Sequence, residues 1–301
     1  MGNKVRCKKN KMRSIWNKNI SGWVLILPSI LFFVFLIWRP ILIGISYSFF
    51  KLDGFTPVEF IGLQNFKDVI SDTNFIQTFQ NTIMYVVWSL VIGFALPVLI
   101  AVLINELAYA KGFFRVGIYL PAIIPGIAVF MIWRMIYGDT SAGLLNTIIS
   151  NFGIDNINWL GSKSLVIPLI VITMTWSGCG ATTVFYIASL QSINNELYEA
   201  ARLDGAGIFA RARCVLFPHL SGIMLLNLVR QIINVFNITE QPLTMTGGGP
   251  NGASLSLGLT NYYYAFKYGQ YDKSLALGVI TFCMLMVLTF LYFKMDKKIN
   301  D

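Results

Sequence analysis

The segment NELYEAARLDGAGIFARARCVLFP, residues 195–218, is a polar stretch of about helical length between two strongly apolar runs. Its charged residues are Glu196, Glu199, Arg202, Asp204, Arg211 and Arg213. Gly205 stands where a short helix can end in a left-handed cap. Connections between packed helices are usually short. A connection this long and this charged therefore predicts a surface that another protein grips.

The composition of the whole chain indicates a membrane protein. Of its 301 residues, 55% are apolar and only 12% are charged, whereas soluble domains carry about a quarter charged residues. Basic residues that contribute to the net charge of +9 flank the first and last apolar runs: Lys4, Arg6, Lys8, Lys9, Lys11, Arg13, Lys18, Lys294, Lys297 and Lys298. Such flanks face cytoplasm and anionic lipid. This placement argues for membrane lipid, and against nucleic acid, as a partner.

The apolar runs predict an all-α integral membrane protein with six transmembrane helices. A spanning helix needs about 20 predominantly apolar residues. The segments that qualify are about 21–48, 82–106, 114–137, 165–189, 218–239 and 272–294. The first run exceeds the roughly 7–15 residues of a signal-peptide core, so it is interpreted as an uncleaved anchor. Pro40 is expected to bend or end its regular part.

The distribution of basic residues predicts the orientation. Six crossings place both termini on one side, together with the connections near 107–113 and 190–217. Those connections contain or adjoin Lys111, Arg115, Arg202, Arg211 and Arg213, whereas the longer connections on the other side hold Lys51, Lys67, Lys163 and Lys267. The positive-inside rule therefore places both termini and the segment 190–217 in the cytoplasm.

This topology divides the chain into four parts. We expect a cytoplasmic basic tail over 1–19 and a first transmembrane helix with its outer connection over 20–75. A core of five transmembrane helices follows over 76–294 and contains the connection 190–217. The remaining residues, 295–301, form a short cytoplasmic tail. Within the core, the run from Gly247 to Gly252 is expected to be irregular, because consecutive glycines with a proline support no regular helix.

The sequence shows no constellation for catalysis or metal binding. His219 is the one histidine, and HExxH, GxSxG and zinc-binding cysteine patterns are absent. The phosphate-binding GxxxxGK[ST] pattern is absent too, so the chain is predicted not to hydrolyse nucleotide itself and to bind no cofactor and no metal. The energy for uphill transport would have to come from a partner protein or from an ion gradient.

A polar stripe runs along the predicted fifth span. Its members follow one another in steps of three and four residues, which places them on one helix face: Asn227, Arg230, Gln231, Asn234 and Asn237. An unpaired amide in hydrocarbon costs a few kcal/mol, and a mid-helix arginine about 2.5–3.5 kcal/mol. The stripe therefore faces either a hydrated path for a hydroxyl-rich solute or other helices that it bonds.

Two features beside the stripe add to the candidate path. Arg230 needs an anion, which is either a carboxylate on a partner subunit or one on the solute; the second case suggests an acidic sugar such as a uronic-acid-containing oligosaccharide. In the fourth span, Ser177, Gly178 and Gly180 permit close helix approach. Trp176 presents a ring either to a sugar face or to neighbouring side chains.

Several segments resemble the ABC importer permeases. Glu199-Ala200-Ala201, Asp204-Gly205-Ala206 and the later Pro218 are similar to the EAA loop of that family. Supporting segments are FIGLQNFKDVISD, QTFQNT, FRVGIYLPAIIPGIAVFMIWRMIYGD, GLLNTI, LQSINNELYEAARLDGAG and TMTGGGPNGAS. Their order from about Gly22 onward resembles the sugar-importer permeases of the maltose-transporter larger-subunit type, which implies the type I ABC importer permease fold.

The resemblance implies a division of labour with partners. A coupling helix at about 195–206 would dock on an ATPase subunit, with Glu199 and Asp204 making polar contacts. The other implied partners are a second permease, a second ATPase and an extracellular solute-binding protein, in a bacterial plasma membrane. ATP would be hydrolysed by the partner subunits only.

The resemblance also implies a sugar site. The positions that match it are Met174, Ser177, Gly178, Ala181, Gln231, Asn234, Val235 and Ile238. For Met174, Val235 and Ile238, plain packing is the alternative role. A gradient-driven carrier or channel is the alternative function, although neither paired intramembrane carboxylates nor an inverted repeat is visible. A membrane-embedded enzyme is a third and more remote possibility.

Overall fold

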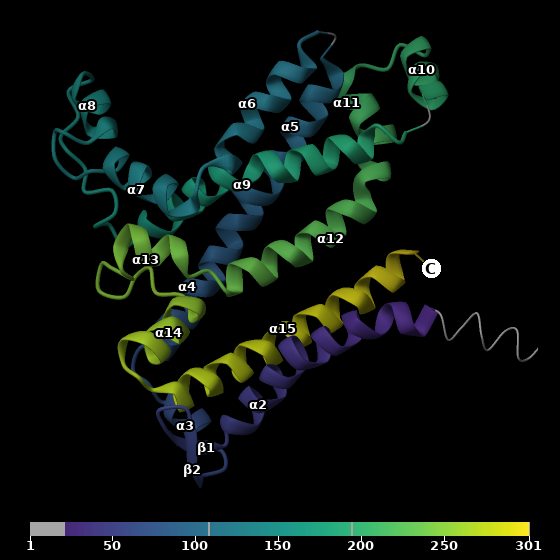
Figure 1. The fold of residues 1–301 in the computed structure, drawn as a ribbon. Coiled ribbons are helices and arrows are strands. Elements are labelled where there is room, and N and C mark those ends of the chain that lie inside the picture. The colour runs from purple at the N-terminus through teal and green to yellow at the C-terminus, as the bar shows by residue number, and fades with distance from the viewer. Residues whose placement is uncertain (1–21, 108, 194, 301) are drawn as a thin grey trace, which may run out of the picture.

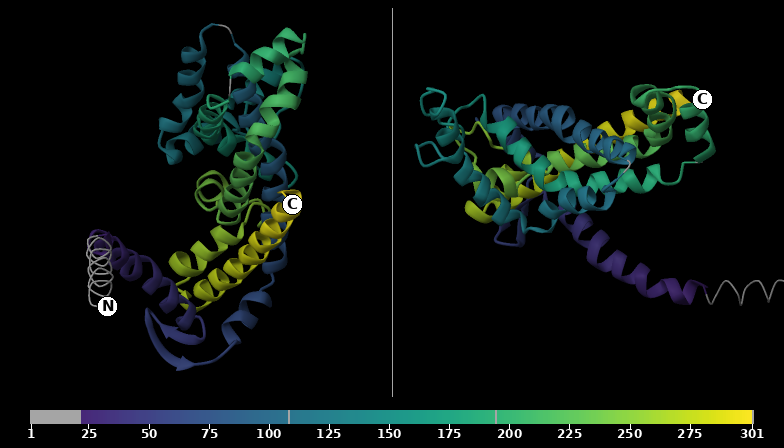
Figure 2. Two further views of the ribbon diagram at one scale, coloured as in Figure 1. Left: turned by 90° about the vertical axis from the view of Figure 1, so that its right-hand side faces the viewer. Right: turned by 90° about the horizontal axis from the view of Figure 1, so that it is seen from above.

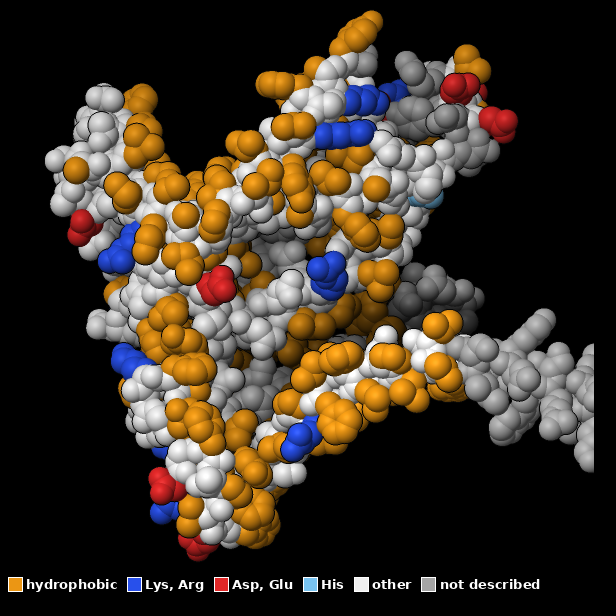
Figure 3. Space-filling view, in the orientation of Figure 1, with side chains coloured by type: hydrophobic (Ala, Val, Ile, Leu, Met, Phe, Trp, Pro, Cys, Tyr) orange, Lys and Arg blue, Asp and Glu red, His pale blue; other side chains and the backbone are white. Residues whose placement is uncertain are grey.

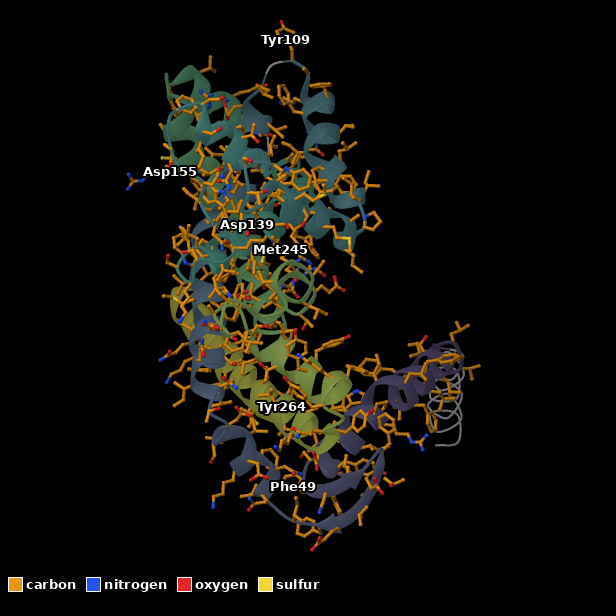
Figure 4. The ribbon with its side chains drawn as sticks, turned by 90° about the vertical axis from the view of Figure 1, so that its left-hand side faces the viewer. Phe49, Tyr109, Asp139, Asp155, Met245 and Tyr264 are labelled. Atoms are coloured by element: carbon orange, nitrogen blue, oxygen red, sulfur yellow. The ribbon has the colours of Figure 1, made fainter. Side chains whose placement is uncertain are left out.

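The structure is a computed structural model that describes residues 22–107, 109–193 and 195–300. The basic tail predicted over 1–19 lies outside the described residues. Helices dominate the described chain, and the molecule is long rather than round (Figure 1). Tyr109, in the connection between the second and third spans, and Phe49, near the end of the first, lie at opposite ends of the molecule (Figure 4).

Five helices of the described chain are long and apolar enough to cross a membrane. The first spans Gly22–Tyr47 and contains the π-helical turn η1 (Val34–Trp38) and α2 (Arg39–Tyr47). Pro40 is the second residue of α2 and follows the π-helical turn η1 directly, so it lies inside the continuous helix. Of the two outcomes expected at Pro40, a bend or an end, the end does not occur.

The second, fourth, fifth and sixth spans follow the apolar runs with shifted ends. The second span, Phe75–Glu106, consists of α4 (Phe75–Trp88), η2 (Ser89–Phe94) and α5 (Ala95–Glu106). The fourth span is α9 (Val166–Leu190), and the fifth, Ala212–Phe236, consists of η3 (Ala212–Leu216) and α12 (Phe217–Phe236). The sixth span, Tyr271–Lys294, lies within α15 (Tyr271–Asn300). The second helix begins seven residues before the predicted start at 82. The fifth begins within the predicted connection 190–217 and ends at Phe236.

The third apolar run is not one straight helix. It forms α6 (Lys111–Ile123) and α7 (Gly126–Ile136), which are bent by 94° relative to each other. Pro125 explains the break, because a residue before proline is pushed out of the helical region and Ile124 has φ −72° and ψ 133°. The prediction of a continuous helix over 114–137 is wrong in this respect. Counted as one bent span, the pair brings the number of candidate spans to six.

The end of the molecule that carries Phe49 contains a β-hairpin that the sequence analysis did not predict. Strands β1 (Phe50–Asp53) and β2 (Thr56–Phe60) pair antiparallel around a turn at Gly54, whose φ is +58°. A glycine with positive φ at the first position of a two-residue loop, here Gly54-Phe55, is typical of a hairpin turn. After the hairpin, the buried Asn65 of α3 (Gln64–Ile70) donates to the carbonyl oxygens of Ser48 and Phe50, both at 2.9 Å. These bonds attach the end of the first span to α3.

Short helices build the connections on the side of the spans that faces away from α10 (Asn195–Leu203) (Figure 1). They are α8 (Leu144–Ser150), α13 (Glu240–Thr246), α14 (Leu257–Tyr262) and the π-helical turn η4 (Tyr263–Lys267). The glycine run is irregular as predicted, with positive φ at Gly247, Gly248 and Gly252. It is held in place, because Asn81 donates to the Gly252 carbonyl at 2.8 Å and the Tyr263 hydroxyl to the Gly247 carbonyl at 3.0 Å.

A further hydrogen bond joins η4 to the residues just before the second span. The Tyr264 hydroxyl donates to the Asp72 carboxylate at 2.8 Å. Burial raises the pKa of Tyr264, and the hydrogen bond and charge of Asp72 raise it further. The phenol therefore stays protonated and remains a donor at physiological pH.

The helices pack around three apolar clusters. Tyr85, Val129 and Ile170 represent a cluster between α4, α7 and α9, and Ala101 and Leu216 a second one where α5, α9 and η3 meet. The third joins α3, α14 and α15. By contrast, the first span is splayed from the bundle over its N-terminal part (Figure 2) and buries none of its apolar window. Many large apolar side chains are exposed along the helices on the face shown in Figure 3, as expected for contact with lipid.

Candidate functional site

The polar segment 195–218 forms a projecting helix with a sharp exit. Helix α10 (Asn195–Leu203) stands out from one end of the bundle (Figure 1). Gly205 has φ +76°, and the amide of Ala206 donates to the Ala201 carbonyl at 3.0 Å. A left-handed residue with this bond across it closes a helix C-terminus. The cap predicted at Gly205 is therefore present, and α11 (Ile208–Arg211) begins directly after it.

The polar side chains of this segment are available to a partner. Glu199 and Asp204 are exposed, as are Ala200 and Gly205. Ala201 and Ala206 are half-buried toward the rest of the segment. His219, near the start of α12, lies with its Nε2 3.1 Å from both the Ser189 carbonyl oxygen and the Ser192 hydroxyl. This histidine therefore attaches the end of the fourth span to the fifth span, which is a structural role.

A polar hollow lies between the second, fourth and fifth spans. Its first part has a volume of about 210 Å³ and is lined by Gly93, Phe94, Ala181, Thr182, Phe185, Tyr186, Asn227, Arg230, Gln231 and Asn234. The adjoining part has a volume of about 160 Å³ and is lined by Gly93, Pro97, Met174, Thr175, Gly178, Cys179, Thr182, Gln231, Asn234 and Val235. Four residues line both parts, so we treat them as one polar hollow.

Most of the predicted path residues meet at this hollow. From α12 they are Asn227, Arg230, Gln231, Asn234 and Val235, and from α9 they are Met174, Gly178 and Ala181. The stripe on the fifth span therefore faces Gly178 and Ala181 of the fourth span across the hollow. A ligand in the hollow would contact both helices at once.

The remaining predicted path residues lie elsewhere. Asn237 follows the last residue of α12, and its amide bonds back to the Ile233 carbonyl at 2.9 Å. The Trp176 ring packs edge-on against Trp133, with ring centroids 5.7 Å apart. The Ser177 hydroxyl is satisfied by the Met174 carbonyl at 3.0 Å. Ile238 is buried in the apolar cluster around Tyr85.

The second span supplies wall residues that sequence reasoning missed. Gly93 lies in the π-helical segment η2, and a Cβ there would stand 2.5 Å from Gln231 Nε2. The same nitrogen donates to the Ser89 carbonyl at 3.0 Å. Short π-helical segments often occur at functional sites. No local sequence signal marks this one, because the glycine is needed only when Gln231 of another helix approaches.

The hollow also contains two buried polar groups from facing helices. The Tyr186 hydroxyl interacts with the Asn227 side chain, and neither this hydroxyl nor Asn227 Nδ2 has another hydrogen-bond partner among the described residues. Their remaining hydrogen-bonding capacity favours water or a polar solute. Arg230, at the rim, is exposed, and the described residues include no carboxylate within salt-bridge distance of it. The hollow is therefore suited to an uncharged or anionic polar solute.

The comparisons with known proteins agree with this geometry. A family model described as binding-protein-dependent transport system inner membrane component matches residues 93–301. The trehalose/maltose transport system permease protein MalF of Thermococcus litoralis is 29% identical over 281 residues, covering 93% of this chain and 95% of that protein. The multiple sugar-binding transport system permease protein MsmF of Streptococcus mutans is 30% identical over 292 residues, covering 95% and 98%.

A solved structure has the same fold. The crystal structure of a bacterial ABC transporter involved in the import of the acidic polysaccharide alginate contains a chain that superposes with a TM-score of 0.84 at 23% identity. The superposition covers 97% of the present chain and all of that chain. The predicted all-α membrane fold of the type I ABC importer permeases is thereby confirmed. The chain belongs to the family of binding-protein-dependent transport system inner membrane components.

Proposed function

We propose that this chain is one permease half of an ATP-driven importer of sugars or oligosaccharides. In this proposal it forms the translocation path with a second, homologous permease. Two cytoplasmic ATPase subunits supply the energy, and an extracellular solute-binding protein delivers the cargo. The observation that carries the proposal is a single chain with both a projecting, capped helix and a polar hollow between its spans. The sugar-transport names of the relatives support the choice of cargo.

The orientation follows from the distribution of charge. With the α10 end in the cytoplasm, the basic connections lie inside and the β-hairpin and glycine run lie outside, in keeping with the positive-inside rule. Both termini are then cytoplasmic, and the membrane is a bacterial plasma membrane. The glycine run at 247–252 is placed where a binding protein would dock.

Helix α10 and its exit at Gly205 are the proposed contact for an ATPase subunit. The residues assigned to this contact are Glu199, Ala200, Ala201, Asp204, Gly205 and Ala206. The two carboxylates give the contact its polar character, and the small residues let the chain turn sharply at the contact. This proposal explains why so charged a segment occurs in a protein with so few charges.

The polar hollow is the proposed path for the solute. Asn227, Gln231 and Asn234 offer hydrogen bonds to sugar hydroxyls, and the small residues Gly178 and Ala181 leave room opposite them. Gln231 connects the fifth span to the second through its hydrogen bond to the Ser89 carbonyl. It is the residue best placed to change its hydrogen-bond partner when the path opens. Polar groups placed in this way fix a ligand's orientation.

The experiment that tests this function is uptake by the assembled complex. The chain is produced with the second permease, the ATPases and the binding protein of its own system and reconstituted into liposomes. Radiolabelled oligosaccharide is expected to accumulate only with ATP on the ATPase side and binding protein on the other. Uptake by this chain alone, driven by a proton or sodium gradient, would instead establish the carrier as the function.

Arg230 gives the solute a charge preference in this proposal. A hydrogen bond to a charged group contributes about 1.5–3 kcal/mol, so Arg230→Gln is expected to lower uptake of a uronic-acid-containing oligosaccharide about tenfold relative to a neutral one. Competitive uptake of the two sugars measures the ratio. Asn237→Ala is the control, because Asn237 lies off the hollow and is expected to leave the ratio unchanged. Equal losses for both sugars with Arg230→Gln would contradict the preference and favour pairing of Arg230 with the second permease.

A further inference from the structure

Arg211 joins the exit of the projecting helix to the end of the second span. It is the last residue of α11, and its Nη1 donates to the carbonyl of Ala206 at 2.6 Å. Its Nη2 donates to a carboxylate oxygen of Glu106, with which it forms an ion pair. One guanidinium therefore holds two segments that are 105 residues apart in the chain.

The ion pair is shielded from solvent. The side chains of Arg211 and Glu106 retain only 13% and 9% of their exposure. A pair that is this buried is screened by salt much less than a surface pair. Removing either partner would leave the other charge buried with one partner fewer, which is strongly unfavourable. The link between the two segments is therefore held firmly rather than made and broken at the surface.

The second span leads from this ion pair to the polar hollow. Glu106 is the last residue of α5, and α5 continues into η2 without a break. Pro97 of α5 and Gly93 of η2 both line the hollow. At 1.5 Å per residue, the thirteen steps from Glu106 to Gly93 span about 20 Å. A displacement applied at Glu106 thus reaches the wall of the hollow through a single helical segment.

The residues just before the projecting segment are attached to other helices. With the Gln191 amide turned to satisfy both groups, its oxygen accepts from the two terminal nitrogens of Arg115 at 3.0 and 3.2 Å. His219 bonds Ser192 from the side of α12. These contacts connect to the third and fifth spans. Arg211 supplies the connection to the second span, which is the one that carries Gly93.

We propose that Arg211 and Glu106 are positioning residues that transmit motion from the ATPase contact to the polar hollow. The inference rests on the proposed function, in which an ATPase subunit moves α10. When the capped exit of α10 at Ala206 is displaced, Arg211 moves with it. The ion pair then moves Glu106 and α5, and so moves Gly93 at the edge of the hollow. Neither residue lines the polar hollow. Their loss therefore uncouples ATP hydrolysis from transport and spares both binding sites.

The test is the number of sugar molecules imported per ATP hydrolysed by the full reconstituted complex. Glu106→Gln and Arg211→Gln remove the charges with little change in side-chain size or polarity. Each is expected to lower this ratio about tenfold, within the range of effects seen for residues that carry coupling. Basal ATP hydrolysis should persist. Because both substitutions break one link, the double variant is expected to fall no further than either single variant.

Arg213→Gln is the matched control, since Arg213 lies two residues away, carries the same charge and is exposed. It is expected to keep the wild-type ratio. A wild-type ratio in Glu106→Gln and Arg211→Gln, an equal loss in the control, or losses that multiply in the double variant would each overturn the inference. A purely structural role would lower the yield of complex without changing the ratio.

Two charge-conserving variants test the inference if Glu106→Gln and Arg211→Gln prevent assembly of the complex. Glu106→Asp keeps the charge but shortens the side chain. Arg211→Lys keeps the charge but removes the forked guanidinium group that reaches both Ala206 and Glu106. They are expected to lower the ratio by a smaller factor, and an unchanged ratio in both overturns the inference. Wild-type complex without ATP-dependent uptake would contradict the proposed function itself. Normal uptake by the wild type with unchanged ratios in the variants contradicts this inference alone.

Discussion

Replacing Gly205 by proline is expected to abolish ATP-driven uptake while the protein still inserts in the membrane. Gly205 has φ +76°, and proline fixes φ near −65°, so the capped exit of α10 cannot form. The amide of Ala206 would lose its bond to the Ala201 carbonyl, and the position of the helix relative to α11 would change. Uptake and transport-stimulated ATP hydrolysis should both fall at least a hundredfold, because the two activities depend on one docked helix.

The measurement compares uptake per inserted protein with that of a matched variant. Gly207→Ala changes a glycine two residues away whose φ is not positive and whose Cβ would meet no neighbour, so it is expected to transport normally. Glu199→Lys changes the surface of α10 without altering its cap, and it is expected to abolish uptake as well. Normal uptake by well-expressed Gly205→Pro would contradict the assignment of α10 as the ATPase contact.

Substitution of Gly180 by alanine is expected to destabilise the folded protein by about 3 kcal/mol or more. Overpacking a core typically costs about 1–3 kcal/mol, and here the obstacle is backbone rather than a flexible side chain. A Cβ at Gly180 would stand 2.1 Å from the carbonyl oxygen of Ile118 and 2.8 Å from Tyr119 Cα. Helix α6 would have to move away from α9, where the two helices cross closely.

Thermal unfolding in detergent, followed by size-exclusion chromatography of heated samples, measures this effect. The control is Gly178→Ala, two residues earlier on α9, where an added Cβ meets no atom within 4 Å. It should unfold at the wild-type temperature. Equal unfolding temperatures for the two variants would show that α6 and α9 do not cross as closely as the structure indicates.

The polar stripe shows how much of the candidate site the helical periodicity of the sequence can predict. Steps of three and four residues placed Asn227, Gln231 and Asn234 on one face, and they do line one hollow. The same rule included Asn237, which lies past the end of α12 and bonds back to its own helix. A periodic pattern describes positions on an ideal helix, and it carries no information on where that helix stops.

The bend in the third span illustrates the opposite case. Pro125 was present in the apolar run, yet hydropathy averages over a window and treated 114–137 as one segment. The local rule for residues before proline predicts a change of direction at Ile124. Whether such a change becomes a small kink or a bend of 94° depends on the helices that pack on either side.

The sequence by itself determined the membrane class, the six apolar segments, the cap at Gly205 and the polar face of the fifth span. These features follow from composition and from rules that act within about one helical turn. Only the tertiary structure decided that Gly93 and Tyr186 join that face, and that Arg211 meets Glu106. Such contacts connect residues dozens to more than a hundred positions apart. Their formation depends on the complete packing of the helices, and no local pattern encodes it.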